Sequence, residues 1–290
     1  MTVSVASKPP EQPEAKPLRL AWDHVVFFTI FHSIALGALV FNFSWAGLGV
    51  ALLLHWCFGS LGICLGYHRL LSHRSFQVPL WLERVFALFG ALAIQGGPIF
   101  WVASHRQHHA YTEHEEKDPY SARRGFWWSH IMWLIYQRDE VFNPANNARL
   151  APDISRDPFY RWLDRNHLVP QVILGLLLYG LGEWTGSGGW TFVTYGIFVR
   201  AVTLWHCTWL INSASHFWGY RRFDDSDDNA RNLWWAAILA YGEGWHNNHH
   251  ADPKCAKAGL TWWEIDMTFW AIWALEKVGL ARKVHRPAAH

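Results

Sequence analysis

Charged residues are scarce in this chain of 290 residues. Asp, Glu, Lys and Arg together make up 17% of it, and the formal net charge is only +2. No run of basic residues could follow a phosphate backbone, which argues against a nucleic-acid partner. From His24 to His68 there is no charged residue at all. At about 20 residues per span, this stretch is long enough for two transmembrane helices.

Cysteine is also sparse, and the first residues lack a targeting pattern. The four cysteines form no C-x-x-C pair and no regular framework, so we expect reduced residues that pack inside the protein. Residues 1–20 are predicted to be a flexible tail, because their prolines and charges leave too little apolar area for folding. They contain no apolar stretch of the kind found in signal peptides, and we expect a prokaryotic origin.

Aromatic residues, by contrast, are abundant, with 21 tryptophans and 18 phenylalanines. Tryptophan collects at membrane interfaces, where one edge of the ring meets lipid and the other meets water. The sequence therefore predicts an all-α membrane protein with four transmembrane helices in two hairpins. A buried soluble hairpin is the alternative for the first pair. The predicted spans are residues 24–43, 45–67, 167–182 and 190–212.

Lysine and arginine indicate how these spans are oriented. They are missing from the two short turns within the hairpins and crowd the other segments. The positive-inside rule then places both termini, residues 68–166 and residues 213–290 in the cytoplasm. We predict a single domain over residues 21–290, with a helical cytoplasmic cap. Arg200 lies within the fourth span and must face protein or water.

The apolar stretch of residues 85–102 is expected to be an interfacial or re-entrant helix. It contains Gly96, Gly97 and Pro98, which interrupt a regular helix. A full span would also place the histidine clusters on either side of it across the bilayer from each other. We therefore expect both clusters on the cytoplasmic face.

Histidine clusters are the strongest functional signal. In a helix, His246, His249 and His250 project from one face, because they lie at positions i, i+3 and i+4. The same spacing recurs from His105 to His109. Imidazole suits iron, zinc, copper or nickel, and this many ligands fits two metals that share one site. The predicted ligands are His68, His73, His105, His108, His109, Asn212, His216, His246, His249 and His250.

The pair His68 and His73 does not follow helical spacing. Residues five apart differ by about 140° around an α-helix, so the two side chains cannot share a face. We therefore predict that the second span's helix ends near Arg69.

With these motifs in place, the sequence resembles the membrane-bound fatty-acid desaturases, which carry three histidine boxes on a four-span scaffold. Four residues separate His68 from His73, and the third box begins with histidine; both features are similar to the Δ9 branch, and above all to cyanobacterial acyl-lipid enzymes. The animal acyl-CoA branch has Arg-Asp before its second box and Asn-Asp earlier. This sequence has Ala103-Ser104 and Gly96-Gly97 there, which favours a lipid-linked acyl substrate.

The resemblance implies a reaction, its cofactors and a location. It implies insertion of a cis double bond between C9 and C10 of a saturated C16 or C18 chain esterified to a glycerolipid. Two iron ions would act with O2 as co-substrate, and ferredoxin would supply two electrons, since no cytochrome b5-like extension is present. We expect a multi-pass protein of a prokaryotic thylakoid or plasma membrane, with its active site on the cytoplasmic face.

The resemblance also divides the ligands between the metals. One iron would be held by His68, His73, His105 and His249, with Asn212 reaching it through water. The other would be held by His108, His109, His216, His246 and His250.

Six further residues are candidates for supporting roles. Ligand histidines usually donate their other ring N–H to a carboxylate, and Glu113, Asp118 and Glu243 lie near the boxes; solvated loop acids are the alternative. Arg123 and Arg124 could hold a lipid head group or the electron donor, or simply face the membrane surface. Trp56 precedes His68 by about 18 Å of helix. It could close the substrate tunnel and set chain length, or pack against lipid.

Three rival functions stay open. An acyl-CoA Δ9 desaturase differs only in the substrate's carrier, and a membrane di-iron hydroxylase uses similar histidine clusters. A metal transporter would need ligands at membrane depth, whereas these clusters lie at helix ends. The histidines outside the boxes are expected to be structural or exposed.

Overall fold

The protein is described here by a computed structural model that covers residues 18–137, 139–224 and 228–287. Most of the predicted tail, residues 1–17, lies outside the described residues. Within them the chain is helical and forms no strand, only isolated bridges such as that between Leu20 and Tyr136. The prediction of an all-α fold is confirmed for this part of the chain.

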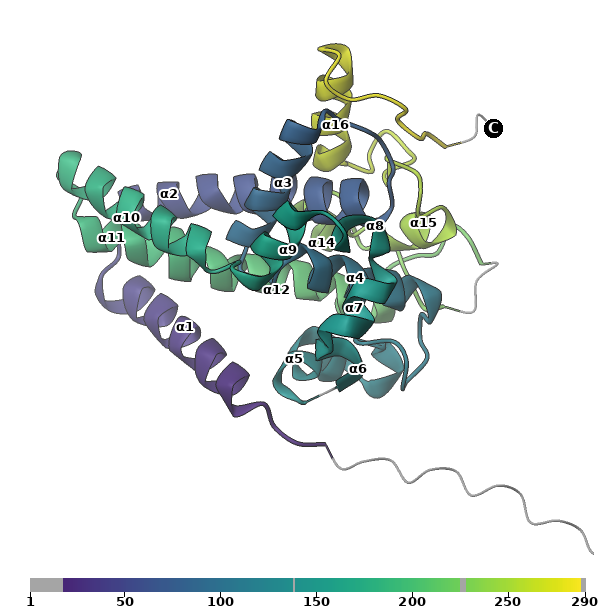
Figure 1. Ribbon diagram of the computed structural model, residues 1–290, viewed down its shortest axis with the longest axis horizontal. Coiled ribbons are helices and arrows are strands. Elements are labelled where there is room, and N and C mark those ends of the chain that lie inside the picture. Colours follow the sequence, from purple (N-terminus) through teal and green to yellow (C-terminus); the bar gives the residue numbers. More distant parts are fainter. Residues whose placement is uncertain (1–17, 138, 225–227, 288–290) are drawn as a thin grey trace, which may run out of the picture.

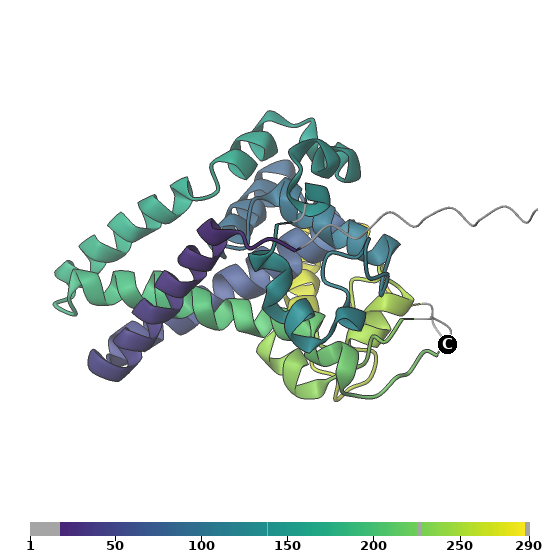
Figure 2. The ribbon, with the colours of Figure 1, turned by 90° about the horizontal axis from the view of Figure 1, so that it is seen from below.

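Long apolar helices extend to one side of the molecule and shorter helices gather at the other (Figures 1 and 2). α2 runs directly into η1, and α11, η4 and α12 follow one another without a break; η1 and η4 have π-helical hydrogen bonding. The long elements are α1 (Trp22–Phe41), α2 (Trp45–Trp56), η1 (Cys57–Ser72), α10 (Val169–Trp184), α11 (Gly189–Val193), η4 (Thr194–Val199) and α12 (Arg200–Asn212).

Two of these helices are long and apolar enough to cross a membrane. They are Trp22–Phe41, with 20 residues, and Trp45–Ser72, with 28. A helix of 20 residues covers about 30 Å, the thickness of the hydrocarbon core. α10 is also apolar but has only 16 residues. The turn between α1 and α2 is capped by Ser44, whose hydroxyl accepts a hydrogen bond from the Gly47 N–H at 3.1 Å.

The shorter helices form the cap end. The predicted helix at residues 85–102 is divided between α3 and α4, because Gly96 adopts φ 93° and Pro98 begins α4. The elements are α3 (Leu80–Leu92), α4 (Pro98–Ala110), η2 (Ala122–Arg124), η3 (Trp128–Met132), α5 (Trp133–Ile135), α6 (Asp139–Phe142), α7 (Pro144–Leu150), α8 (Pro152–Ser155), α9 (Pro158–Arg165), α13 (Ala214–Phe217), α14 (Trp234–Leu239), α15 (His246–Ala251) and α16 (Met267–Lys277).

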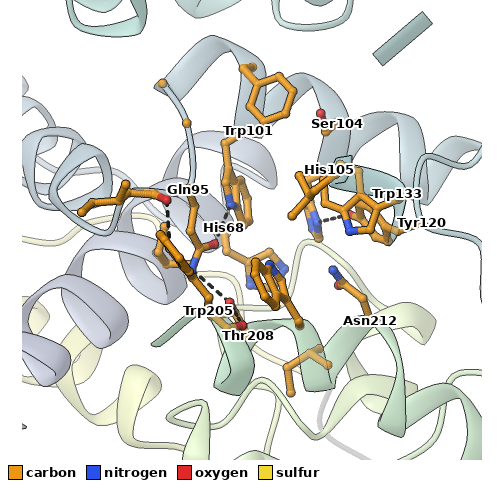
Figure 3. A pocket seen from close by; sticks show the side chains of 18 of the residues that line it. His68, Gln95, Trp101, Ser104, His105, Tyr120, Trp133, Trp205, Thr208 and Asn212 are labelled. Atoms are coloured by element: carbon orange, nitrogen blue, oxygen red, sulfur yellow. Dashed lines mark hydrogen bonds between the residues drawn. The ribbon is translucent and has the colours of Figure 1, made fainter. Parts of the chain in front are cut away.

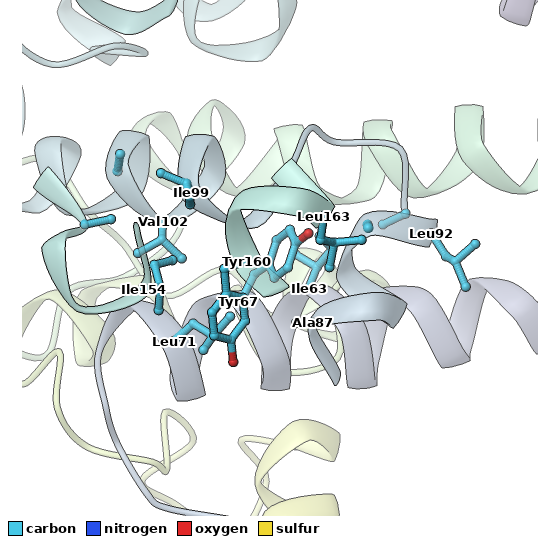
Figure 4. Close-up of a cluster of buried hydrophobic side chains, with 14 of the residues drawn as sticks. Ile63, Tyr67, Leu71, Ala87, Leu92, Ile99, Val102, Ile154, Tyr160 and Leu163 are labelled. Carbon is cyan, nitrogen blue, oxygen red and sulfur yellow. The ribbon is translucent and has the colours of Figure 1, made fainter. Parts of the chain in front are cut away.

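The core joins the end of the second long helix to this cap (Figure 4). Tyr67 and Leu71 of η1 pack in one buried cluster with Val102 of α4 and Leu163 of α9. α3 lies close against η1, since a Cβ at Gly62 would come within 2.5 Å of the Phe89 carbonyl carbon. This packing fixes where η1 ends, and η1 carries the first histidine pair.

Arg200 lies within the fourth predicted span, and its charged side chain faces protein, as expected for a charge at that position. Its side chain is fully buried in protein. It donates hydrogen bonds to the carbonyl oxygens of Leu92 at 2.6 Å and Gly196 at 3.0 Å, and to Gln171 Oε1 at 3.4 Å. These contacts tie α12 to the ends of α3 and α10.

Candidate metal centre and substrate cavity

The first histidine pair is brought together by an unusual helix. η1 continues to Ser72, so the predicted end near Arg69 is wrong. The His73 N–H instead donates to the His68 carbonyl at 3.1 Å, the i to i+5 pattern of a π-helix. That wider turn returns the fifth residue to the same face, and the two imidazole centroids lie 4.8 Å apart.

The remaining predicted histidines come from three other helices. The second box lies in the last turns of α4, His216 lies on the short α13, and the third box begins α15. Their ring nitrogens fall into two groups, and within each group the candidate ligand atoms lie within 4.8 Å of one another. The first group is His68, His73, His105, His109 and His249, and the second group is His108, His216, His246 and His250.

This division differs from the expected one at a single residue. His109 was expected with the second group, but its Nε2 lies 3.0 Å from Nε2 of His249, in the first group. Its neighbour His108 points to the second group. Consecutive residues on α4 differ by about 100° around the helix, which directs these two imidazoles toward different groups.

The arrangement of the ring nitrogens fits bound metal ions. Nε2 of His68 faces Nε2 of His249 at 3.0 Å, and Nε2 of His216 faces Nε2 of His246 at the same distance. Nδ1 of His68 and of His216 points to a carboxylate, so each ring proton belongs there and each Nε2 carries a lone pair. Nε2 of His108 is buried and has no hydrogen-bond partner within the part of the chain that the structure describes. Lone pairs directed inward in this way are suited to binding a cation.

The three predicted carboxylates all contact predicted ligands. Glu243 Oε2 lies 2.7 Å from His68 Nδ1, Glu113 Oε1 lies 2.9 Å from His216 Nδ1, and both Asp118 oxygens lie 3.0 Å from His108 Nδ1. Such contacts fix the tautomer and orient the ring. A fourth carboxylate was missed, since Asp228 Oδ2 lies 3.1 Å from Nδ1 of His250. Asp228 stands 22 residues before His250, so sequence spacing gave no signal.

Burial sets the ionisation of these groups. It lowers the pKa of His250 to about 4, and together with neighbouring imidazoles it holds the pKa of His105 and His249 well below the usual range. These three imidazoles are therefore neutral, as metal ligands must be. Burial opposes ionisation of Glu243, but Arg69 and His68 hold its pKa below the ordinary value. Glu113 likewise has a lowered pKa, because His216 outweighs burial.

An apolar cavity of about 490 Å³ runs past both histidine groups (Figure 3). Its lining includes His68 and His105 of the first group, His108 and His246 of the second, and Asn212. Aromatic side chains form much of the remaining wall, namely Phe27, Phe28, Trp101, Trp133 and Trp205.

One part of the wall is fixed by hydrogen bonds, and two lining residues mark the opening. Trp101 Nε1 donates to Gln95 Oε1 at 3.3 Å, and Gln95 Nε2 donates to the Thr208 hydroxyl at 2.9 Å. Asp23 at the start of α1 and Leu168 before α10 are the exposed residues of the lining. The cavity therefore reaches the surface between α1 and α10.

Trp56 is not part of this cavity. Its side chain is 44% exposed on the outer face of α2, and it is absent from the lining. The expected role in closing the tunnel therefore has no support in the geometry. The fully buried lining residues Cys64 and Ala240 lie against each other, with the thiol 3.6 Å from the Ala240 carbonyl oxygen.

Trp56→Ala is therefore expected to leave the preferred acyl chain length unchanged. Cys64→Phe should shift it toward shorter chains, because the larger ring fills space at the buried wall. Gas chromatography of products from mixed C14 to C18 substrates measures both. A chain-length shift in Trp56→Ala, with none in Cys64→Phe, would contradict this assignment.

The two arginines lie away from the substrate cavity. The Arg124 guanidinium stacks 3.2 Å above the ring of Trp128. Arg123 lines a second, more open cavity of about 430 Å³, together with His109, Tyr111, His114 and Asp228. This second cavity connects the surface with a ligand of the first group and with the carboxylate that contacts His250.

Comparison with known sequences agrees with this geometry. A family model for fatty acid desaturases matches residues 43–284. The chain belongs to the fatty acid desaturase family. The family match therefore includes every predicted ligand and nearly all of the described helices.

Several desaturases of named specificity are similar over nearly their whole length. The chain is 59% identical to an sn-2 palmitoyl-lipid 9-desaturase of Nostoc sp. (strain 36), over 98% of this chain and 96% of that one. It is 47% identical to an sn-1 stearoyl-lipid 9-desaturase of Anabaena variabilis, over 98% and 97%. It is also 39% identical to an acyl-CoA 5-desaturase of Anemone leveillei, over 94% and 85%. The resemblance to cyanobacterial acyl-lipid desaturases is confirmed.

Proposed function

We propose that this desaturase inserts a cis double bond between C9 and C10 of a saturated C16 or C18 chain esterified to a glycerolipid. The observation that carries the proposal is the apolar cavity with both histidine groups along its wall. Dioxygen and two electrons with two protons would be converted to water as the chain loses two hydrogens. Two iron ions bound by the histidines would supply the oxidising chemistry, which no side chain can provide.

The protein's own residues orient the substrate and keep water out. Trp101, Trp133 and Trp205 would enclose the acyl chain beside the histidines, and the apolar faces of these rings would displace water from it. The Gln95 hydrogen bonds hold Trp101 in one orientation. The distance between the opening and the histidines would then determine which carbons are desaturated.

The lining also favours a lipid ester over a coenzyme A thioester. Among the described residues, the lining includes Asp23 and Asp164 near the opening but neither lysine nor arginine, so it offers no ammonium or guanidinium group to the phosphates of coenzyme A. Acyl-CoA stays the second candidate substrate, since a relative 39% identical is named an acyl-CoA 5-desaturase. Supplying stearoyl-CoA and stearoyl glycerolipid separately to the purified protein would distinguish them.

We further propose four membrane spans in two hairpins, with a cytoplasmic cap within one domain over residues 21–290. Apolar side chains on the long helices support this, since Leu36 of α1 is 64% exposed and Leu176 of α10 is 71% exposed. Trp45, Trp184 and Trp190 are exposed at the two hairpin turns, as expected at a membrane interface. A prokaryotic thylakoid or plasma membrane would hold the protein.

Electrons would enter from the cap side. The second cavity leads from the surface to His109, and the exposed Arg123 at its edge could pair with an acidic donor such as ferredoxin. This gives Arg123 a role in donor binding rather than in head-group binding.

Expression in a host that lacks a Δ9 desaturase and contains ferredoxin tests the function. Mass spectrometry should locate a new double bond at C9 in the membrane lipids. Hydroxylated chains would favour the di-iron hydroxylase, and metal uptake without modified lipid would favour the transporter. Unchanged lipids, with folded iron-loaded protein and ferredoxin present, would overturn the proposal.

A further inference from the structure

The two histidine groups differ in the carboxylates that surround them. In the second group, three of the four imidazoles contact a carboxylate through Nδ1. These are His108 with Asp118, His216 with Glu113 and His250 with Asp228, at distances of 2.9 to 3.1 Å. The side chains of Glu113 and Asp118 are about 98% buried. The second group thus lies within a buried ring of carboxylates.

In the first group, fewer of the histidines contact a carboxylate. Among its five histidines, His68 contacts a carboxylate, that of Glu243. Glu243 also forms an ion pair with the buried Arg69 at 3.0 Å, so much of its charge is already compensated; in the second group, Glu113 has a longer contact of 3.9 Å with Arg123, whose side chain is 52% exposed. His105 Nδ1 lies 3.3 Å from a neutral group, the Tyr120 hydroxyl.

This asymmetry has two consequences for a bound metal. A carboxylate that accepts a proton from Nδ1 makes Nε2 a stronger donor to the metal. A buried dication or trication also needs nearby negative charge, because imidazole ligands are neutral and the low dielectric strengthens the attraction. Both effects favour the second group, and both grow as the metal is oxidised.

The first group is also more accessible to solvent than the second. A histidine of the first group, His109, lines the second, open cavity, whereas the second group meets that cavity through the carboxylate of Asp228 rather than through an imidazole. In the second group, the side chains of His108, His216 and His250 are each only 2% exposed. A chelator would therefore reach the first group more readily.

We propose that the two metal positions are inequivalent, with the second group holding its iron more tightly and favouring the oxidised state, and with Asp118, Glu113 and Asp228 as positioning residues. This inference rests on the proposed two-iron centre. The first group then contains the labile iron and the second group the retained one.

Iron release from the purified, ⁵⁷Fe-loaded protein in detergent tests this. With both irons kept ferrous by anaerobic dithionite, excess ferrozine, a chelator of ferrous iron, should remove one iron quickly and one slowly, followed by absorbance. Before addition, Mössbauer spectra should show two distinct quadrupole doublets of equal area. His73→Ala, which lacks a first-group ligand, should retain only the slowly released iron and its doublet.

Asp118→Asn should accelerate the slow phase about 10- to 100-fold, the usual effect of removing such a partner, and shift the matching doublet. Asp118→Glu should restore most of the slow phase. The matched control is Asp252→Asn, at an exposed residue after the third box, and it should leave both phases unchanged. If Asp118→Asn does not fold, Glu113→Gln tests the same effect at another histidine of the second group.

Release of both irons in one phase, or acceleration of only the fast phase by Asp118→Asn, would overturn the inequivalence and leave the two-iron centre intact. A folded protein that cannot be loaded with two irons would overturn both the inference and the proposed centre.

Discussion

Substitution of His109 by alanine is expected to lower the yield of 9-unsaturated acyl lipid by more than about a hundredfold. Loss of a carboxylate behind a ligand already costs about 10- to 100-fold, and loss of the ligand itself should cost more. His109 borders both groups, since Nε2 lies 3.0 Å from that of His249 and its ring centroid lies 4.6 Å from that of His250. Its removal should disturb both metal positions.

The measurement is lipid analysis after expression in the Δ9-deficient host, together with iron content of the purified protein. His285→Ala is the matched control, because the His285 side chain is exposed and belongs to neither group. It should retain normal activity and about two irons per chain. Retained activity in His109→Ala, at equal protein abundance, would exclude His109 as a ligand.

The histidines could be found from the sequence because the relevant geometry is local. Spacing of i, i+3 and i+4 places side chains on one face of any α-helix, whatever surrounds it. His246, His249 and His250 therefore revealed a candidate metal site before the fold was known. The carboxylates Glu113, Asp118 and Glu243 could be selected for a similar reason, since each lies within ten residues of a predicted ligand.

Features that depend on tertiary packing or on a change of helix type could not be found in this way. The π-helical turn at His68 and His73 is a change of helix type, and no spacing rule for an α-helix predicts it. The position of His109 depends on how α4 and α15 meet. Trp56 was placed by distance along the helix, but the direction of its side chain decides whether it meets the cavity. Asp228 reaches His250 only through the folded chain.

Substitution of Arg69 is expected to lower the stability of the folded protein more than the other changes considered. Its Nη1 lies 3.0 Å from Asp266 Oδ2, and its Nη2 lies 3.0 Å from Glu243 Oε1, with all three side chains at least about nine-tenths buried. Arg69→Met would leave two carboxylates in a low dielectric without their cation. Breaking a buried pair in this way costs about 3–5 kcal/mol. At about 2–4 °C per kcal/mol, the unfolding midpoint should fall by about 6–20 °C.

Arg84→Met is the matched control for that substitution. Arg84 pairs with Asp157 at 3.1 Å, but its side chain is 40% exposed, and a pair of this kind contributes about 0–1 kcal/mol. Thermal unfolding of both variants in the same detergent separates a buried ion network from a surface pair. Equal shifts would mean that water reaches Glu243 and Asp266 once Arg69 is removed. In that case Glu243 would keep its negative charge without Arg69. The first histidine group would then have more negative charge beside it than the ion pair with Arg69 indicates.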